Sequence, residues 1–271
     1  MKRYKPRTPG VRARQIVEYK DLSDVKPFKK LVKGIKRSVG INAQGKKTVR
    51  HKGAGVKKRY RCIDFKRNDV DVEATVKSIE YDPYRTAFIA LIVYRNGKKS
   101  YIIAPHNIKV GDVVKTTTKT TVNVGYCSQL KNIPVGTTVH HIELIPGKGA
   151  QLCRSAGTSV LVMAKSSEFA TLKLPSGEVR LVHLDCKAVV GEASNIYKKN
   201  EVVGKAGINR HKGKRPTVRG SVMNACDHPH GGGEGRAPIG KSGPRTPWGK
   251  KANVKTRRKK SKYILRSRKG K

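Results

Sequence analysis

The densest group of chemically reactive side chains in the sequence lies between residues 223 and 235. Cys226, His228 and His230 alternate along the chain, and Asp227 and Glu234 lie close by. A thiolate with two imidazoles could hold a metal ion. A carboxylate that orients a histidine is one half of a catalytic dyad. A third interpretation is a flexible recognition loop that fits an irregular RNA surface, and residue chemistry alone leaves all three open.

The residues around this group favour the recognition loop. Ligands that alternate suit a strand, whereas Pro229 and the glycines over 231–235 are typical of a loop. The Ser and Cys residues nearby lie in no recognisable nucleophile elbow or triad. Trp248, a little further on, could stack on a base or a sugar. The alternative for this tryptophan is a small local core beneath the loop.

Two other segments combine glycine with positive charge. Residues 48–61 contain seven basic residues, His51 included, and two glycines. Glycine lets a backbone approach phosphates closely, and arginine grips them with two hydrogen bonds. The alternative is a solvated linker. Residues 146–158 match neither G-x-x-x-x-G-K-[ST] nor G-x-G-x-x-G, which favours a basic loop on phosphate over an ATP site.

Net charge indicates the kind of partner. The 271 residues include 61 Lys and Arg against 18 Asp and Glu, a formal net charge of +43. A compact fold with this charge repels itself unless a polyanion neutralises it, and nucleic acid is the commonest large polyanion. Residues 1–60 carry +17, residues 61–200 carry +8 and residues 201–271 carry +18. Two strongly basic arms therefore flank a nearly ordinary middle.

The middle segment, which must position these loops, has the pattern of a β protein. Apolar and polar residues alternate over 70–77, and an apolar, β-branched run covers 88–94. Asn96-Gly97 then predicts a hairpin turn before 101–103. Further strands are expected over 160–163, 169–174, 179–184 and 188–190, and no helical stripe exceeds about two turns. We expect roughly ten short strands in two small barrels that meet near residues 125–130.

Composition excludes several classes of protein. Residues 201–271 hold 12 glycines, 5 prolines and two aromatic residues. Such an arm cannot order itself alone, and we expect folded RNA to order it. The five cysteines form no C-x-x-C, which indicates reduced thiols in a cytosol-like compartment. The longest apolar run, 87–94, is far below the roughly 18 residues of a membrane span, and no secretory signal is recognisable.

Motifs along the whole chain resemble one family. They are T-V-R-H-K-G from Thr48, R-Y-R-C-I-D-F-K-R from Arg59, P-G-K-G-A-Q-L-C-R-S-A-G-T from Pro146, R-P-T-V-R-G from Arg215, D-H-P-H-G-G-G-E-G-R from Asp227 and T-P-W-G-K from Thr246. Together they resemble the bacterial-type second protein of the large ribosomal subunit, a universal large-subunit ribosomal protein family.

The resemblance implies a fold and a domain order. The implied core is all-β, with an oligonucleotide-binding-type barrel over 60–126 followed by an SH3-like barrel over 127–200. A basic N-terminal extension covers 1–59, and a Gly/Pro-rich basic C-terminal extension covers 201–271.

The resemblance also implies a function without catalysis. The chain would be a structural constituent of the large ribosomal subunit and a primary rRNA-binding protein. It would support assembly of the peptidyl-transferase region, subunit association and tRNA binding in translation. Implied partners are large-subunit rRNA, small-subunit rRNA at the subunit interface and neighbouring ribosomal proteins, with no membrane and no homo-oligomer. No cofactor or metal is implied beyond magnesium associated with the RNA. The implied location is the ribosome of a bacterial cytoplasm, and the A-P-I-G at 237–240 also resembles plastid forms.

Matching positions and residue chemistry together give the residues expected to bind rRNA. They are Arg50, His51, Lys52, Lys57, Lys58, Arg59, Arg61, Lys148, Arg154, Arg210, Lys212, Arg215, Arg219, Asn224, Asp227, His228, His230, Arg236, Trp248 and Lys250. The family's much-discussed histidine corresponds to His228. We expect it to organise RNA locally, because the reaction centre of the family's ribosome is made of RNA.

The sequence departs from the family pattern at three places. Val56 stands where the family commonly has the second histidine of H-G-G-G-H-K. His211 replaces the usual tryptophan before K-G, and Cys226 replaces a residue that is usually apolar. The last change weakens the metal interpretation further.

Two other hypotheses make different predictions. A free nucleic-acid-compacting protein would not sediment in fixed ratio with large ribosomal subunits. A hydrolase or transferase centred on Asp227, His228 and His230 would show bound metal or a pH-dependent activity in RNA-free protein.

Overall fold

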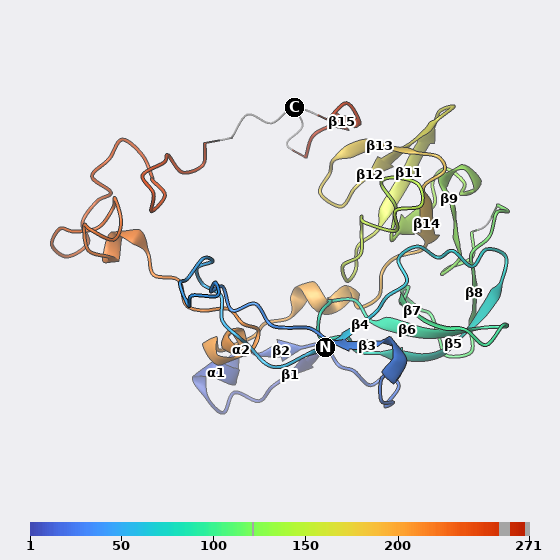
Figure 1. Ribbon diagram of the computed structural model, residues 1–271, viewed down its shortest axis with the longest axis horizontal. Coiled ribbons are helices and arrows are strands. Elements are labelled where there is room, and N and C mark those ends of the chain that lie inside the picture. Colours follow the sequence, from blue (N-terminus) through green and yellow to red (C-terminus); the bar gives the residue numbers. More distant parts are fainter. Residues whose placement is uncertain (121, 255–260, 269–271) are drawn as a thin grey trace. The chain divides into compact units, whose positions relative to one another are not determined.

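The chain forms two compact units. The computed structural model describes residues 1–120, 122–254 and 261–268. Met1–Lys36, Lys57–Ala206 and Ser261–Lys271 make up the first unit, here called the β unit. Arg37–Val56 and Gly207–Lys260 make up the second, here called the loop unit, which Figure 1 draws largely as irregular chain. The chain therefore crosses from the β unit to the loop unit and back twice.

A four-stranded antiparallel sheet forms the first half of the β unit. Its order is β7-β6-β5-β8, from β5 (Glu73–Glu80), β6 (Ile89–Tyr94), β7 (Lys99–Ile103) and β8 (Val113–Lys115). Side chains of β5 alternate between buried and exposed, and Val76, Ile92 and Ile102 lie in the core. The prediction of a strand from residue 70 is wrong at its beginning. Asp71 has a φ of 58° and its N–H donates to the carbonyl of Thr116, so the chain turns before the ladder starts.

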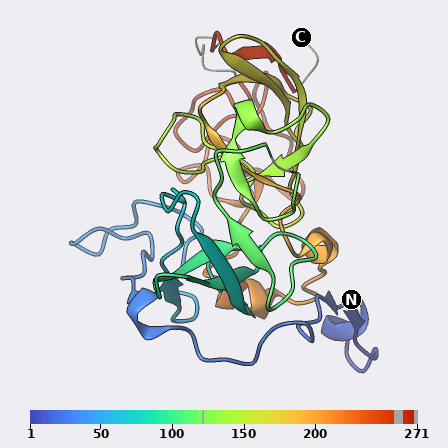
Figure 2. The same cartoon turned by 90° about the vertical axis from the view of Figure 1, so that its right-hand side faces the viewer.

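A seven-stranded antiparallel sheet forms the second half of the β unit. Its order is β15-β13-β12-β11-β10-β14-β9, and Figure 2 shows its strands curving around a common interior. The strands are β9 (Cys127–Gln129), β10 (Thr138–His140), β11 (Val160–Lys165), β12 (Phe169–Lys173), β13 (Val179–His183), β14 (Lys187–Val190) and β15 (Ile264–Arg266). Leu130, Ile142 and Leu172 are fully buried in its core. The prediction of an all-β core, an oligonucleotide-binding-type barrel followed by an SH3-like barrel, is confirmed.

The two sheets are joined inside the β unit. Thr116 forms a parallel bridge with Cys127, the first residue of β9. The N–H of Ser194 donates to the carbonyl of Ala104 over 3.0 Å. The N–H of Ala150 donates to the carbonyl of Phe65 over 2.9 Å. Loops that are distant in sequence therefore meet at this junction.

The remaining elements are short. They are β1 (Lys2–Arg3), α1 (Pro9–Arg12), β2 (Gln15–Ile16), η1 (Lys29–Leu31), β3 (Val32–Gly34), β4 (Arg59–Arg61), η2 (Leu130–Asn132), η3 (Ile196–Asn200), α2 (Ala206–His211) and η4 (Gly220–Val222). The expectation of no long helix is confirmed for the described residues. None of their helices has the length and apolar character that crossing a membrane requires.

Candidate nucleic-acid interface

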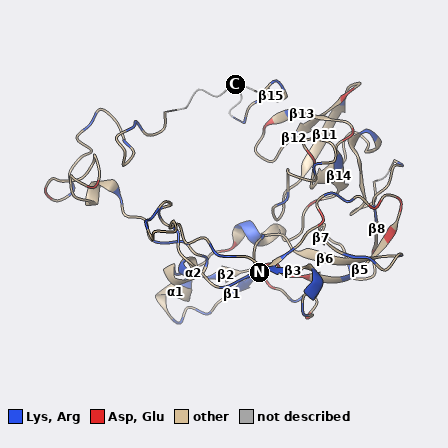
Figure 3. Cartoon of the chain, viewed as in Figure 1, with Lys and Arg blue, Asp and Glu red and all other residues tan. Residues whose placement is uncertain are grey.

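The described residues of the loop unit carry many positive charges and form no apolar core. Over 37–56 and 207–254 there are 15 Lys and Arg residues against two acidic ones, and Figure 3 shows the basic segments in blue. No hydrophobic residue in these two ranges is buried, and no ion pair is formed within them. Cations in these ranges are attracted to an external polyanion, because the two acidic residues there form no ion pair with them.

Among the residues of this unit that the structure describes, His228 is the buried polar side chain, with 8% of its surface exposed. The carbonyl of Asn224 accepts hydrogen bonds from the N–H groups of Asp227, at 3.0 Å, and of His228, at 3.3 Å. The N–H of Gly231 donates to the carbonyl of His228 over 2.8 Å. These bonds close residues 220–232 into a compact loop, here called the histidine loop.

Two glycines make the histidine loop possible. A Cβ added at Gly220 would overlap the imidazole ring of His228, and one added at Gly231 would overlap the carbonyl of Asn224. Neither glycine needs a left-handed backbone. Both positions require glycine because the His228 ring and the Asn224 carbonyl already occupy the space that a Cβ would need.

Both imidazoles accept hydrogen bonds from backbone N–H groups. The N–H of His230 donates to Nδ1 of His228 over 3.0 Å, and the N–H of Arg245 donates to Nε2 of His230 over 2.7 Å. A ring nitrogen that accepts such a bond uses its lone pair to do so. The ring centroids lie 4.7 Å apart. One nitrogen of each ring is therefore committed to holding the loop.

The side chains of the metal and catalytic interpretations are not gathered at one point. Within the part of the chain that the structure describes, no three His, Cys, Asp or Glu side chains are grouped to hold a metal. Cys226 and Asp227 are exposed, whereas His228 is buried. All five cysteines are free, and burial raises the pKa of Cys153 to about 11 and of Cys186 to about 12, so these two thiols stay protonated.

Trp248 lies on the surface with 73% of its area exposed. The interpretation of a local core beneath the loop is therefore wrong. The guanidinium carbon of Arg50 lies 5.2 Å from the centre of the Trp248 ring, a cation–π arrangement within the loop unit. A stacked arginine and an open indole face together form a surface on which a base or sugar can lie.

Residues 51–56 run beside residues 211–215 in the loop unit. Lys52 forms an antiparallel bridge with Lys214, and the N–H of Arg215 donates to the carbonyl of His51 over 3.1 Å. Gly55 has a φ of 63°, and the adjacent Val56 N–H donates to the carbonyl of His211 over 2.9 Å. Backbone atoms alone hold these segments together. The side chains of His51, Lys52 and Arg215 remain exposed for an external ligand.

A cluster of cations and aromatic rings lies on the β unit. The guanidinium carbon of Arg154 lies 5.1 Å from the ring centre of Phe65, and that of Arg85 lies 6.0 Å from it. Arg85 also lies 5.6 Å from the ring centre of Tyr60. Sequence reasoning did not predict this cluster, in which Arg85 also forms an ion pair with the buried Asp82 over 3.3 Å. A usable signal was the run Tyr81–Arg85, which places an arginine beside two tyrosines after a predicted strand.

The loop from Pro146 to Ala150 is held by a buried carboxylate. Glu143, with 1% of its surface exposed, accepts hydrogen bonds from the N–H groups of Gly149 at 2.8 Å, Lys187 at 3.0 Å and Gly147 at 3.3 Å. The backbone donors that would cradle a nucleotide phosphate therefore point at Glu143. This arrangement supports the interpretation of a basic loop, from which the exposed Lys148 reaches outward.

The structure places the predicted residues on both units. Lys57, Lys58, Arg59, Arg61, Lys148 and Arg154 belong to the β unit, and the others belong to the loop unit. His228 is buried, and Lys58, Arg61 and His230 are half-buried. The others are exposed: Arg50, His51, Lys52, Lys57, Arg59, Lys148, Arg154, Arg210, Lys212, Arg215, Arg219, Asn224, Asp227, Arg236, Trp248 and Lys250.

Comparison with known protein families agrees with this picture. Residues 28–116 match the family described as Ribosomal Proteins L2, RNA binding N-terminal domain. Residues 123–249 match the family described as Ribosomal Proteins L2, C-terminal domain. The two matches adjoin at the junction between the sheets and together cover most of the chain. The chain belongs to the ribosomal protein L2 family.

Proposed function

We propose that this ribosomal constituent is a primary binder of large-subunit rRNA whose loop unit is ordered by that RNA. The observation that carries the proposal is the loop unit itself, in which 15 cations over 37–56 and 207–254 surround no buried hydrophobic residue. Ordering such a segment costs conformational entropy that apolar burial does not offset. Phosphates supply the compensating interaction through charge neutralisation and counterion release.

The finer roles follow from the same surfaces. Basic loops on both units allow the protein to bring separate RNA segments together, which supports a role in assembling the peptidyl-transferase region. Contacts with small-subunit rRNA, and with them subunit association and tRNA binding, belong to this proposal, as do a monomeric state and a bacterial or organellar ribosome.

We assign the histidine loop a positioning role and the protein no enzymatic activity. His228 and His230 each use one ring nitrogen to accept a backbone N–H. A general base must have a free lone pair aimed at the substrate proton, whereas these two lone pairs are directed at the loop. The exposed Asn224 and Asp227 of the same loop are the groups available to RNA.

Amide hydrogen exchange of the full chain, with and without large-subunit rRNA, tests the main proposal. The free protein should exchange rapidly over 37–56 and 207–254 and slowly in the sheet strands, because only the strands lie over a core. RNA should slow exchange in both loop segments. Equal protection of both units without RNA, or no protection with it, would refute the proposal.

A substitution of His228 tests the positioning role. His228→Ala should impair incorporation of the protein into subunits, because the histidine loop loses its buried ring and the acceptor of the His230 N–H. His211→Ala, which alters an exposed histidine of the same unit, should assemble normally. His228→Ala subunits that assemble fully and fail only at peptide transfer would contradict the assignment.

A further inference from the structure

Strands β3 and β4 of the β unit open into a fork. The pairs Val32↔Arg61, Lys33↔Tyr60 and Gly34↔Arg59 form their short ladder. Beyond it the chains continue as residues 35–36 and 57–58. Within the described residues, no backbone hydrogen bond joins these continuations. Two extended prongs with free backbone polar groups therefore leave the same end of the ladder.

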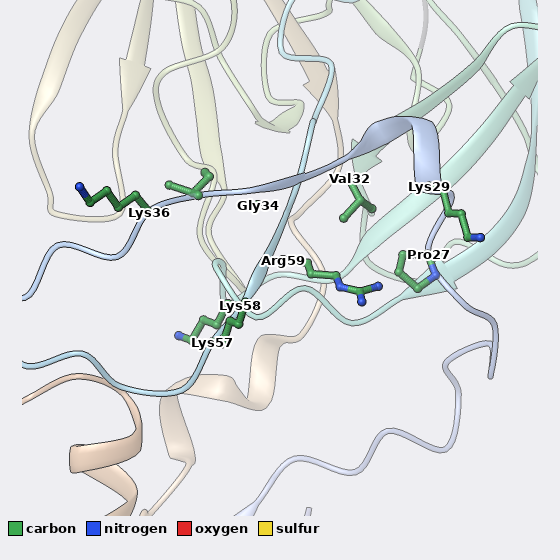
Figure 4. Close-up of a pocket in the computed structure, with 9 residues that line it drawn as sticks. Pro27, Lys29, Val32, Gly34, Lys36, Lys57, Lys58 and Arg59 are labelled. Atoms are coloured by element: carbon green, nitrogen blue, oxygen red, sulfur yellow. The ribbon is translucent and has the colours of Figure 1, made fainter.

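A cleft of about 750 Å³ lies in this fork (Figure 4). Lys36 lines it from one prong, Lys57 and Lys58 line it from the other, and Lys29 and Arg59 complete the charge at its base. No acidic residue is among its lining residues. None of the five cations takes part in the ion pairs that the described part of the chain forms. Their mutual repulsion favours an anion in the cleft.

The distribution of these charges fits an extended polyanion. A single small anion can contact only one or two cations closely, whereas these five come from three separate segments of chain. Successive phosphates of one nucleic-acid strand can meet cations on both prongs in turn. The free N–H groups of the prongs add donors that phosphate oxygens accept.

The apolar lining indicates the form of nucleic acid. Val32, Ile35 and Pro27 share the cleft with the cations, and Ile35 has 46% of its surface exposed. Duplex RNA presents mainly phosphates and sugars, whereas an unpaired strand also offers base faces that pack on apolar surface. We propose that the fork binds a single-stranded segment of RNA, with its phosphates on the lysines of both prongs and a base or sugar against Ile35 and Val32.

Gly34 permits a test that leaves every charge in place. It lines the cleft, its φ lies outside the left-handed region, and a Cβ added to it meets no atom within 4 Å. Gly34→Val should therefore keep β3, since β-branched residues suit strands, while its side chain occupies the cleft. Gly34→Ala adds a smaller side chain at the same place.

The measurement is chemical acetylation of lysines in the full chain, read residue by residue, with a short uridine oligonucleotide as the probe. The oligonucleotide should protect Lys36, Lys57 and Lys58, and Gly34→Val should weaken its binding there by about fivefold or more, the lower end of the cost of losing one stacked base. Gly34→Ala should have a smaller effect. Unchanged protection in Gly34→Val, or equal protection by an RNA duplex of the same length, would overturn the proposal.

Salt dependence provides a second readout. Lys36→Gln combined with Lys57→Gln should reduce the slope of log affinity against log salt for the oligonucleotide by about 1.4, because each lost single-strand contact removes about 0.7. Lys20→Gln combined with Lys98→Gln removes the same charge from lysines already paired with Glu18 and Asp69. This control should leave the slope unchanged, and equal slopes for the two double variants would overturn the proposal.

The inference rests on the proposed RNA-binding function, and large-subunit rRNA as a second probe separates their failures. If rRNA protects lysines of the loop unit and leaves Lys36, Lys57 and Lys58 reactive, the fork proposal alone is wrong. If rRNA protects neither unit, the proposed function is wrong as well.

Discussion

Replacing Glu143 should detach the Pro146–Ala150 loop from the second barrel. The carboxylate accepts three backbone N–H groups, of which those of Gly149 and Lys187 are at 2.8 and 3.0 Å. The N–H of Gly147 lies in an exposed residue, so water can replace its bond. A hydrogen bond to a charged group is worth about 1.5–3 kcal/mol, so the two shorter bonds amount to about 3–6 kcal/mol.

The net loss is smaller, because the alanine variant no longer buries a charge. We expect Glu143→Ala to lower the free energy of unfolding by about 3 kcal/mol. Glu143→Gln should lower the free energy of unfolding by less, since the glutamine amide keeps one acceptor oxygen while its NH2 group faces a backbone donor. The chain should still fold, because domains of this kind have about 5–15 kcal/mol of stability.

Urea unfolding of the full chain, followed by far-ultraviolet circular dichroism, measures this loss. Glu168→Ala is the matched control, because it removes the same charge from an exposed glutamate and should change stability by less than about 0.5 kcal/mol. Amide exchange over 145–150 should accelerate in the Glu143 variants alone. Equal midpoints for Glu143→Ala and Glu168→Ala would refute the reasoning that this carboxylate holds the loop.

Three further outcomes are expected. Burial lowers the pKa of His140 from about 6.5 to about 4, so the folded state resists a proton that the unfolded chain accepts. Its contribution to stability is intact above pH 6.5, and about 3 kcal/mol is lost as the pH falls towards 4. Urea unfolding at several pH values should show this loss as a slope that His140→Asn reduces, while His141, whose pKa burial also lowers, supplies the slope that remains. In the protein bound to large-subunit rRNA, Gly220→Ala should force the His228 ring from its site at about 1–3 kcal/mol and speed amide exchange over 220–232, whereas Gly243→Ala, with open space around it, should not. Arg154→Gln should weaken RNA binding and reduce the salt slope by about 0.7–0.9, and an unchanged slope would place this arginine outside the interface.

Strands could be predicted from local sequence because alternate side chains of a strand face the core and the solvent. The apolar run over 88–94, the Asn96-Gly97 turn and the run over 101–103 became β6, its hairpin and β7. The prediction was wrong where a contact distant in sequence intervened. At Asp71 the backbone leaves the extended conformation, because the N–H of this residue donates to the carbonyl of Thr116.

The candidate interface also has a part that the sequence predicts and a part that depends on the fold. Cations such as Arg210, Lys212 and Arg236 were predicted as rRNA-binding from composition and motif, since charge needs no folded context to attract phosphate, and the structure shows these side chains exposed. The grouping of Arg85 with Phe65 and Tyr60 could not be predicted in this way, because Tyr60 lies in β4 and only the fold brings these rings to Arg85. The open face of Trp248 was equally undetermined until its surroundings were known.

By itself, the sequence determined the β class, the basic loops, the family resemblance and the polyanionic partner, because periodicity, net charge and motif order are properties of the chain read residue by residue. Only the tertiary structure decided that Glu143 closes the Pro146–Ala150 loop, that His228 is buried against Gly220 with its Nδ1 accepting a backbone N–H, and that residues 35–36 and 57–58 diverge into a charged cleft. Each of these depends on which atoms come within hydrogen-bonding or packing distance across long stretches of sequence. Which atoms approach one another is determined by how the chain packs around its two cores. The residue type at one position does not determine it.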